Sequence, residues 1–403
     1  MLVALPTGSF EQENSLNDLK IGVIGAGGRG GVARHAHHPG EGSRIVACCD
    51  KVDTTLERAR ESYGDDIFTT GDYRELLSQD LDAVFVTTPD FLHEEHALAA
   101  IEAGVAVYLE KPMAITIDGC DRILSLAREK QVRLYLGHNM RHMAFVLKMK
   151  RLIDDGVIGE VQTAWCRHFV GNGGDFYFKD WHADRRMTTG LLLQKAAHDI
   201  DVLHWLCGSY TKRVNAMGSL SVYGRITDRH GPEERGSARV DYDHWPPLTQ
   251  KRLNPVVDVE DISMIQMEML NGVLASYQQC HFSPDYWRNY TIIGTEGRIE
   301  NFGNGGDGTH IKLWNRRTSW NPEGDEIFEM DVEKGSHGGA DPKIVSEFVR
   351  FVREGGRINT SPVAARYSVA TGCQATESLR SNGIPLDVPT LDPAIAEHFD
   401  QDE

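Results

Sequence analysis

Residues 21–30 read IGVIGAGGRG. An apolar run followed at once by glycines in the spacing GxGxxG predicts a strand, a tight turn and the start of a helix. Gly25 permits the turn, Gly27 lets the backbone approach a diphosphate, and Gly30 lets the helix and the strand pack closely. Free N–H groups at a helix N-terminus favour negative charge. The stretch therefore predicts a dinucleotide site, and a glycine turn that holds no ligand is the alternative.

An acidic residue follows at the distance that such a site requires. Asp50 closes the next expected strand 20 residues after Gly30, and a carboxylate there accepts hydrogen bonds from the adenosine ribose hydroxyls. The same carboxylate would repel a 2′-phosphate, so we expect NAD in preference to NADP. Lys51 and Arg29 are cations that would weaken this preference. Gly28 and Arg29 lie inside the glycine turn and belong with the expected cofactor-binding residues.

Alternating elements surround this site. From residue 20 to about residue 140, short apolar runs alternate with longer amphipathic stretches, which predicts an α/β fold with a doubly wound parallel sheet of the Rossmann type. After residue 140, successive strands separated by turn signals predict an α+β domain whose mostly antiparallel sheet is covered by helices on one face. Residues 225–255 are rich in charge, glycine and proline and predict a long surface insertion. The chain thus divides into four expected parts: a leader in 1–19, an NAD(P)-binding Rossmann domain in 20–140, a substrate-binding domain in 141–389 and an acidic tail in 390–403.

Composition excludes several classes of protein. The chain has 403 residues, of which 40% are hydrophobic and 25% charged, as in soluble globular proteins. Its 42 basic and 59 acidic residues give a net charge of −17, so we expect neither nucleic acid nor an anionic membrane surface as a partner. No apolar run approaches the roughly 20 residues of a membrane span. The seven cysteines lack CxxC spacing, and the N-terminus lacks a signal sequence, which together predict a reduced, cytoplasmic protein.

Polar residues follow two of the expected strands at the point where each strand ends. Thr88, Pro89 and His93 follow one strand, and Glu110 and Lys111 follow the next. Because the carboxyl ends of such strands face the crevice where ligands bind, we expect all five residues at the cofactor. The proline after Lys111 fixes the turn that presents it, with a cis peptide bond as one option. A lysine desolvated beside an oxidised nicotinamide has a lowered pKa, which suits a general acid–base, whereas a solvated surface lysine is the alternative.

The segment GLLLQKAAHDIDVLHWLCG, residues 190–208, predicts a helix with an unusual polar face. Gln194, Lys195, His198 and Asp201 share one side of that helix, and apolar residues occupy the other. Each polar group would cost roughly a few kcal/mol if it were buried without a partner. The cluster therefore predicts a site, and a hydrogen-bonded structural network is the alternative.

The loop RHFVGNGGDFYFKDWHADRRMTTG, residues 167–190, is expected to wall the substrate pocket. Its aromatic rings suit the apolar side of a sugar, and its donors suit hydroxyl groups. The substrate-binding candidates in this loop are His168, Tyr177 and His182, each with a purely structural role as an equal alternative. No metal-site spacing is found, and we expect no metal.

Seven motifs follow one another in an order known from one protein family. The glycine motif with Asp50, TTPDFLH, EKP, GHNMR, HDID, GTEGRIE and HGGADP span roughly residues 20–388. In this the chain resembles the glucose–fructose oxidoreductase and inositol dehydrogenase-like family, Gfo/Idh/MocA. The resemblance implies a Rossmann domain, a second domain with a large open sheet, a bound NAD(P), and a homo-oligomer, dimer or tetramer, assembled through that sheet.

The resemblance also assigns roles to individual residues. It implies that the lysine of EKP, Lys111, and the histidine of the HDID helix, His198, are catalytic and contact the substrate. It implies that Asp201, three positions later, holds substrate hydroxyls. Within GHNMR, it directs Asn139 to the cofactor and Arg141 to the substrate.

One position departs from the family pattern. Many members carry an aspartate four residues before the histidine, where this chain has Gln194 followed by Lys195. Because Gln194 cannot take a proton, we expect Lys195, one turn from His198, to be the third catalytic residue, with both Gln194 and Lys195 at the substrate. In the expected mechanism, His198 or Lys111 removes a hydroxyl proton while the carbinol hydride passes to the nicotinamide.

Three functions are compatible with these residues. The leading hypothesis is an NAD-dependent dehydrogenase that acts on a secondary hydroxyl of a sugar, glycoside or cyclitol. The second is a glycoside-cleaving enzyme that retains its NAD and so releases product without accumulating NADH. The third is a non-catalytic sugar or nucleotide sensor. Lys111, Lys195 and His198 together disfavour a sensor, which has no need of proton-transfer groups.

Overall fold

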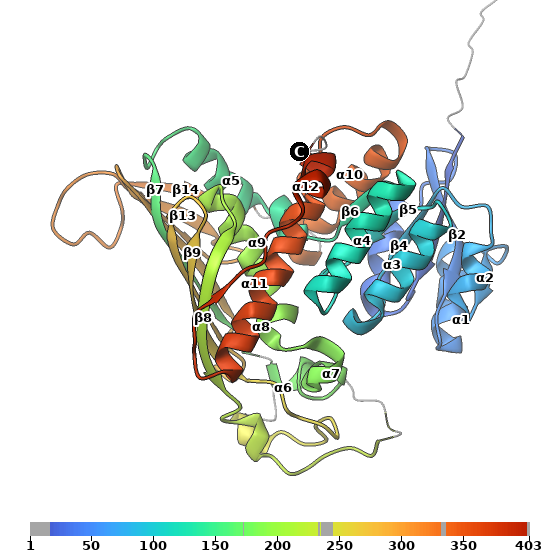
Figure 1. The fold of residues 1–403 in the computed structure, drawn as a ribbon, viewed down its shortest axis with the longest axis horizontal. Coiled ribbons are helices and arrows are strands. Elements are labelled where there is room, and N and C mark those ends of the chain that lie inside the picture. The colour runs from blue at the N-terminus through green and yellow to red at the C-terminus, as the bar shows by residue number, and fades with distance from the viewer. Residues whose placement is uncertain (1–16, 172, 233, 235–244, 332–335, 401–403) are drawn as a thin grey trace, which may run out of the picture.

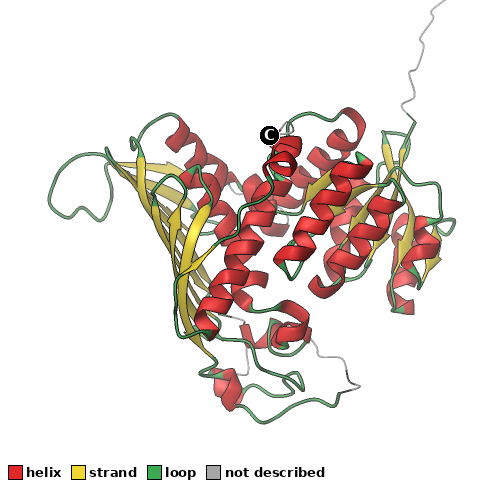
Figure 2. Ribbon diagram, in the orientation of Figure 1, coloured by secondary structure: helices red, strands yellow, loops and turns green. Residues whose placement is uncertain are grey.

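The computed structural model of the protein describes residues 17–171, 173–232, 234, 245–331 and 336–400. Most of the expected leader lies outside these ranges, as do residues 233 and 235–244 of the expected insertion. Figure 1 shows a parallel sheet flanked by helices, and beside it a second, larger sheet. Figure 2 shows that the helices of the second part gather on one face of its sheet, the face turned toward the first part.

The first sheet consists of six parallel strands. Its spatial order is β3-β2-β1-β4-β5-β6, the order of a doubly wound dinucleotide-binding sheet, which confirms the expected fold class. The strands are β1 (Leu19–Ile24), β2 (Ser43–Cys49), β3 (Phe68–Thr70), β4 (Ala83–Val86), β5 (Ala106–Leu109) and β6 (Leu134–Leu136). Every side chain of β4 and β5 is buried, as in a sheet covered on both faces. The strand order reverses between β1 and β4, and ligands bind at the carboxyl ends of such a pair.

Short helices connect these strands. They are η1 (Gly28–Ala36), α1 (Asp53–Tyr63), α2 (Tyr73–Leu77), η2 (Asp90–Leu92), α3 (His93–Glu102), α4 (Ile117–Lys130) and η3 (Asn139–His142). The helix expected after the glycine turn is a nine-residue 3₁₀ helix, because Gly28, Gly30 and Gly31 disfavour a regular α-helix. α4 begins at Thr116, whose hydroxyl accepts a hydrogen bond from the N–H of Gly119.

The second sheet has nine strands in the order β14-β13-β12-β11-β7-β10-β9-β8-β15. β7 and β10 are parallel, and the other neighbouring strands are antiparallel, which confirms the expected mostly antiparallel sheet. The strands are β7 (Val161–Phe169), β8 (Thr211–Ser219), β9 (Ile262–Met269), β10 (Leu274–Cys280), β11 (Trp287–Gly294), β12 (Arg298–Phe302), β13 (His310–Trp314), β14 (Glu326–Glu329) and β15 (Leu386–Asp387). Buried and exposed side chains alternate along β9, so one face packs on the core and the other does not.

The remaining helices follow β6. They are α5 (Ala144–Asp154), α6 (Gly173–Phe176), η4 (Trp181–Ala183), α7 (Arg185–Thr188), α8 (Leu191–Gln194), α9 (Ala196–Cys207), η5 (Tyr223–Arg225), η6 (Pro247–Thr249), η7 (Ser336–Gly339), α10 (Ala340–Glu354), α11 (Pro362–Arg380) and α12 (Pro393–Asp400). The single helix expected over residues 191–206 is divided into α8 and α9, which meet at Lys195. The expected acidic tail contains α12, whose Ile395 and Phe399 are buried in the core because they lie four residues apart on one helix face. None of the helices in the described ranges has the length and apolar character that a membrane crossing needs.

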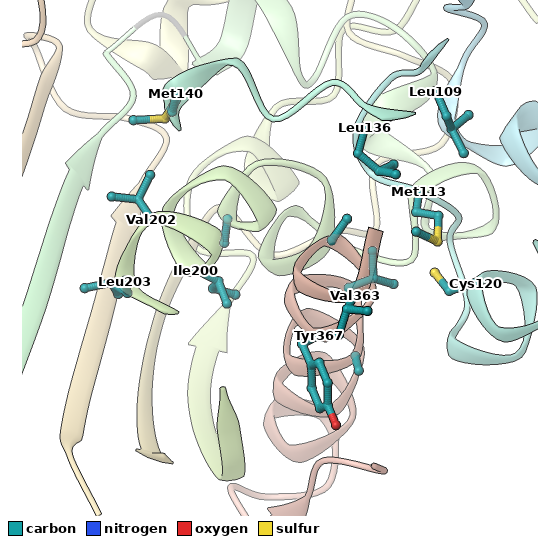
Figure 3. Packing of buried hydrophobic residues seen from close by; sticks show 14 of the residues in the cluster. Leu109, Met113, Cys120, Leu136, Met140, Ile200, Val202, Leu203, Val363 and Tyr367 are labelled. Carbon is teal, nitrogen blue, oxygen red and sulfur yellow. The ribbon is translucent and has the colours of Figure 1, made fainter. Parts of the chain in front are cut away.

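One hydrophobic core joins the two sheets. α11 contacts both α9 and α4, and Figure 3 shows its Val363 between Ile200 of α9 and Cys120 of α4. α10 follows the second sheet in the chain but packs against the first, where the rings of Phe348 and Phe85 meet edge to face with centroids 5.2 Å apart. The parallel sheet therefore completes its core with residues from the C-terminal part of the chain.

Candidate active site

The glycine turn is packed tightly on one side and open on the other. Gly25 has φ +88°, and a Cβ atom there would lie 2.8 Å from the backbone nitrogen of Thr88. A Cβ atom on Gly30 would lie 2.1 Å from the carbonyl oxygen of Gly25. Gly28, by contrast, has no atom within 4 Å of its Cβ position. The turn is therefore a cradle that suits the diphosphate of a dinucleotide.

Asp50 follows β2 and faces this turn. Its carboxylate accepts a hydrogen bond from the N–H of Gly27 at 3.0 Å and another from the N–H of Val52 at 2.9 Å. The side chain remains partly exposed, so its oxygens can still accept from ribose hydroxyls. Lys51 beside it is exposed to solvent.

Arg29 is held by two buried carboxylates. Its Nε donates to Glu110 at 2.5 Å, and its Nη1 donates to Asp341 of α10 at 2.8 Å. Burial opposes the charge of Arg29, but the charge of Glu110, together with Tyr108 and Asp341, outweighs burial and raises the pKa of Arg29. Asn139, expected at the cofactor, donates to Asp341 at 3.1 Å. Arg29 is thus neutralised within the protein, and with Asn139 it ties the glycine turn to α10.

His93 links the two strand ends that carry the expected cofactor residues. Its Nε2 lies 2.8 Å from the carbonyl oxygen of Thr88, and its Nδ1 lies 2.6 Å from the carbonyl oxygen of Pro112. The ring is buried, and the peptide bond between Lys111 and Pro112 is cis. Pro89 lies between the linked Thr88 and the start of η2. His93 therefore contacts backbone on both strand ends and positions the two loops relative to each other.

Lys111 extends from the end of β5 to the helices of the second domain. Its Nζ donates a hydrogen bond to the carbonyl oxygen of Gln194 in α8 at 3.2 Å, and its side chain is partly exposed. Burial lowers the pKa of Lys111, and the negative charge of Asp90 opposes that shift. Asp90 is itself buried, and burial raises the pKa of its carboxyl group. A lysine in this setting can exchange a proton near neutral pH.

Lys195 and His198 lie close to Lys111. The Nζ atom of Lys195 lies 5.7 Å from the centre of the Tyr177 ring. Burial and then the charge of Arg288 lower the pKa of Lys195. Burial, followed by the charges of Lys111 and Lys195, lowers the pKa of His198, whose Nδ1 has no hydrogen-bond partner among the described residues. His198 is thus a neutral base next to two amines.

A fully buried ionic network lies behind this cluster. Asp199 of α9 pairs with His168 at 2.9 Å and with Arg288 of β11 at 3.0 Å, and it also accepts a hydrogen bond from Tyr290. Burial opposes the charge of Asp199, but the charge of Arg288, together with His168 and Tyr290, outweighs burial and lowers the pKa of this carboxyl group. Burial and the Arg288 charge lower the pKa of His168 to about 3. His168, expected at the substrate, is therefore a neutral, inaccessible member of this network.

Asp201, expected at the substrate, pairs with Arg141. Both of its carboxylate oxygens accept from Arg141, at 2.8 Å each, and both side chains are buried. Arg141 also donates to the carbonyl oxygen of Asn359 at 2.7 Å. The two residues expected to hold substrate hydroxyls thus form a bidentate ion pair with each other.

The aromatic loop brings some of its expected residues to the site. The Tyr177 ring packs edge-on against His182, with centroids 5.3 Å apart, and His182 stacks on Trp181. Gln194 is buried, and its Oε1 has no hydrogen-bond partner in the described chain. Within the described ranges, no three histidine, cysteine or acidic side chains gather closely enough to hold a metal.

Two family models match the chain over most of its length. The model for the oxidoreductase family with an NAD-binding Rossmann fold matches residues 19–138, and the model for the GFO/IDH/MocA C-terminal domain matches residues 146–300. The chain belongs to the Gfo/Idh/MocA oxidoreductase family. Both halves of the candidate site, the glycine turn and the α8–α9 segment, lie inside the matched ranges.

Individual members of this family share sequence or fold with the chain. Inositol 2-dehydrogenase/D-chiro-inositol 3-dehydrogenase of Halalkalibacterium halodurans is 34% identical over 198 residues, which cover 47% of this chain and 52% of that enzyme. YteT of Bacillus subtilis (strain 168) is 25% identical over 333 residues, which cover 73% of this chain and 76% of YteT. Levoglucosan dehydrogenase, solved in complex with NADH and levoglucosan, has a TM-score of 0.73 at 21% identity, covering 93% of this chain and all of that one. The match thus spans about half the length of the inositol dehydrogenase, whereas the fold of levoglucosan dehydrogenase is shared over 93% of this chain.

The sequence analysis did not predict several residues of the candidate active site of this protein, namely Asp90, Asp199, Arg288 and Tyr290. Asp199 carries a signal that could have been used, because it lies on the apolar side of the helix that carries His198. An acid on an apolar face predicts a buried cationic partner, since an unpaired buried charge is costly. The identity of that partner, Arg288, has no comparable signal, because it lies on a strand far along the chain.

Proposed function

We propose that this oxidoreductase is an NAD-dependent dehydrogenase that oxidises a secondary hydroxyl of a sugar, glycoside or cyclitol. The observation that carries the proposal is the meeting of Lys111, at a strand end of the parallel sheet, with the α8–α9 segment, through the 3.2 Å hydrogen bond to the Gln194 carbonyl. Two amines and a neutral histidine, His198, are thereby grouped near the end of β5. Relatives named as inositol and levoglucosan dehydrogenases support the class of substrate.

The proposed mechanism divides the work between two residues. When bound, NAD supplies the acceptor for the hydride that leaves the carbinol carbon. His198 is neutral before reaction, because burial and the neighbouring amines disfavour its charged form, and in this state it takes the hydroxyl proton. Lys111 donates a hydrogen bond to the hydroxyl oxygen and stabilises the developing alkoxide. The substrate leaves as a ketone, and the proton passes from His198 to solvent.

A substrate screen tests this function. Sugars, cyclitols and glycosides are incubated with the enzyme and NAD, and NADH formation is followed at 340 nm. Lys111→Ala and His198→Ala are expected to lower kcat/KM by at least about 100-fold, while the surface variants Lys130→Ala and His38→Ala serve as matched controls. The proposal is wrong if no compound reduces NAD, or if both site variants keep full activity. Release of an aglycone without NADH would instead favour the glycoside-cleaving enzyme.

NAD in preference to NADP is part of the same proposal. The Asp50 carboxylate, placed by two backbone N–H groups, would repel a 2′-phosphate, and Arg29 is neutralised by Glu110 and Asp341. Asp50→Ser should therefore raise the ratio of kcat/KM for NADP to that for NAD by about tenfold or more. Glu61→Gln, which removes an exposed carboxylate of α1, is the control. An unchanged ratio would show that Asp50 does not select the cofactor.

We also propose that the enzyme is a cytoplasmic homo-oligomer, dimer or tetramer. All seven cysteines are free thiols, as suits a reducing compartment. The uncovered face of the second sheet exposes the apolar side chains Met217, Met264 and Leu274 on three adjacent strands. An exposed apolar patch on a sheet suits association with a second copy of the chain.

A further inference from the structure

Two amines at the candidate active site lack a carboxylate partner. The Nζ atom of Lys111 donates to a neutral carbonyl group, that of Gln194. The Nζ atom of Lys195 faces the ring of Tyr177. Among the described residues, neither lysine forms an ion pair with an acidic side chain. Both side chains are only partly exposed, so water compensates their charges incompletely.

The arginines whose charges act on these lysines are Arg29 and Arg288. Both are neutralised within the protein, Arg288 by Asp199 and Arg29 by Glu110 and Asp341. Positive charge without a counter-charge is therefore concentrated at Lys111 and Lys195. Such an arrangement is costly for the protein alone and favourable once an anion binds.

The nearby acidic groups do not supply this counter-charge. Asp199 acts on Lys195 from a distance, but its carboxylate is already engaged by Arg288, His168 and Tyr290. Asp90 acts in the same way on Lys111 and is itself buried. A ligand with an anionic group would supply this counter-charge and favour the protonated form of both amines.

We propose that the substrate is an anionic sugar, whose carboxylate or phosphate ester group pairs with Lys195 while the reacting hydroxyl lies at Lys111 and His198. The inference rests on the proposed dehydrogenase function and narrows its substrate class. The Tyr177 ring beside Lys195 offers an aromatic face for the apolar side of the sugar. A charge-assisted hydrogen bond to a lysine fixes which end of the sugar faces the nicotinamide.

Matched substrates test the proposal. A hexose, the corresponding hexuronate and the hexose 6-phosphate are compared as substrates with NAD, and the anionic-to-neutral ratio of kcat/KM is the readout. The wild-type enzyme should favour one anionic sugar by about tenfold or more, and Lys195→Met should lose most of that preference. Preference for the uronate or for the phosphate distinguishes the two anionic groups. Lys130→Met, on the exposed surface of α4, is the matched control.

Two results would overturn the proposal. One is a kcat/KM of the wild type for the neutral hexose that equals or exceeds its kcat/KM for both anionic counterparts. The other is an unchanged anionic-to-neutral ratio in Lys195→Met, the result expected if Lys195 only relays protons, since kcat would then fall for both substrates together. Lys195→Arg keeps the positive charge and should keep the preference for the anionic sugar. It therefore shows whether a loss in Lys195→Met comes from the missing charge or from misfolding.

A binding measurement separates this proposal from the proposed function. Calorimetric titration of hexuronate and hexose 6-phosphate into the NADH-loaded protein should give a Kd that Lys195→Met weakens by about tenfold or more. If no sugar reduces NAD but an anionic sugar binds through Lys195, the dehydrogenase proposal fails and the anion site stands. If neutral sugars are oxidised and neither anion binds, the anion site fails and the dehydrogenase proposal stands.

Discussion

His198 and His168 have different roles because their surroundings differ in hydrogen bonding and exposure. Burial lowers the pKa of each ring. His168 is tied by its Nδ1 to Asp199 and has no exposed surface. His198 is partly exposed and stands beside Lys111 and Lys195. Only His198 combines a neutral ring with access to a substrate, which is why we assign proton transfer to it.

The pH dependence of turnover should report the charges around His198. Its base form is the neutral ring, so activity is lost as the pH falls through its pKa, which burial and the adjacent amines hold below the ordinary value of 6.5. Removing the cation in Lys195→Met raises this pKa, so the acid limb of kcat/KM should move to higher pH. The measurement is kcat/KM for one neutral substrate from about pH 5 to about pH 9. A limb that stays in place would show that Lys195 does not act on the base.

The sequence predicts site residues where a local pattern places them. It does not predict ion-pair partners that lie far away in the chain. The end of a strand and the period of a helix are local patterns, and they led to Lys111 and His198, which the fold brings into one cluster. Helix periodicity also put Asp201 on the expected polar face. It could not reveal that Arg141, 60 residues away in the chain, engages both oxygens of Asp201. Ion pairs between distant segments depend on the final packing of the elements.

At the scale of elements, the glycine turn depends on a helix from the far end of the chain. Arg29 joins the turn to Glu110 after β5 and to Asp341 in the first turn of α10. His337 of η7 also lies 3.0 Å from Asp341. The position of the cofactor-binding turn is therefore set partly by residues that follow the second sheet.

Arg29→Met should destabilise the protein by about 3 kcal/mol, because it leaves the Glu110 and Asp341 carboxylates buried without their partner. It should also raise KM for NAD, since the turn loses its anchor. Unfolding by urea, followed by tryptophan fluorescence, gives the free energy of unfolding. The double variant Arg29→Met/Asp341→Asn removes one of the stranded charges and should recover part of the loss. An equal loss of unfolding free energy in the single and double variants would contradict this role of the Arg29–Asp341 ion pair.

The elements themselves were largely predictable, and the exceptions have physical causes. The parallel strands are predictable because they are apolar runs. The second sheet is predictable because its successive strands are separated by turn signals. α12 was missed because its acidic residues mask the apolar positions Ile395 and Phe399. The break at Lys195 was missed because the periodicity of α8 and α9 continues through it.

At the scale of the whole molecule, the second sheet uses its two faces differently. One face carries α5, α9 and α11 (Figure 1). The other exposes Met217 and Met264, paired across β8 and β9, with 68% and 45% of their surfaces accessible. Flexible methionine side chains adapt well to an opposing surface.

Met264→Glu should dissociate the proposed oligomer, because it introduces a charge at the centre of the apolar face. The mass of the wild type and the variant is measured by light scattering after size-exclusion chromatography. The wild type should be a dimer or a tetramer and the variant smaller. Leu248→Glu, which adds the same charge at an exposed position in η6, should leave the mass unchanged. A monomeric wild type would contradict the proposal directly.

The packing of α10 on the parallel sheet has a consequence for folding during synthesis on the ribosome. Phe85 and Tyr108 bury their rings against Phe348 of this helix. Until the chain has been synthesised past Phe348, the part of the sheet around Phe85 and Tyr108 lacks this cover, although η1 and α1 already pack on the same side. We expect the nascent sheet to remain open to chaperones during this interval, and the parallel-sheet part to mature only when the part with the second sheet is nearly complete.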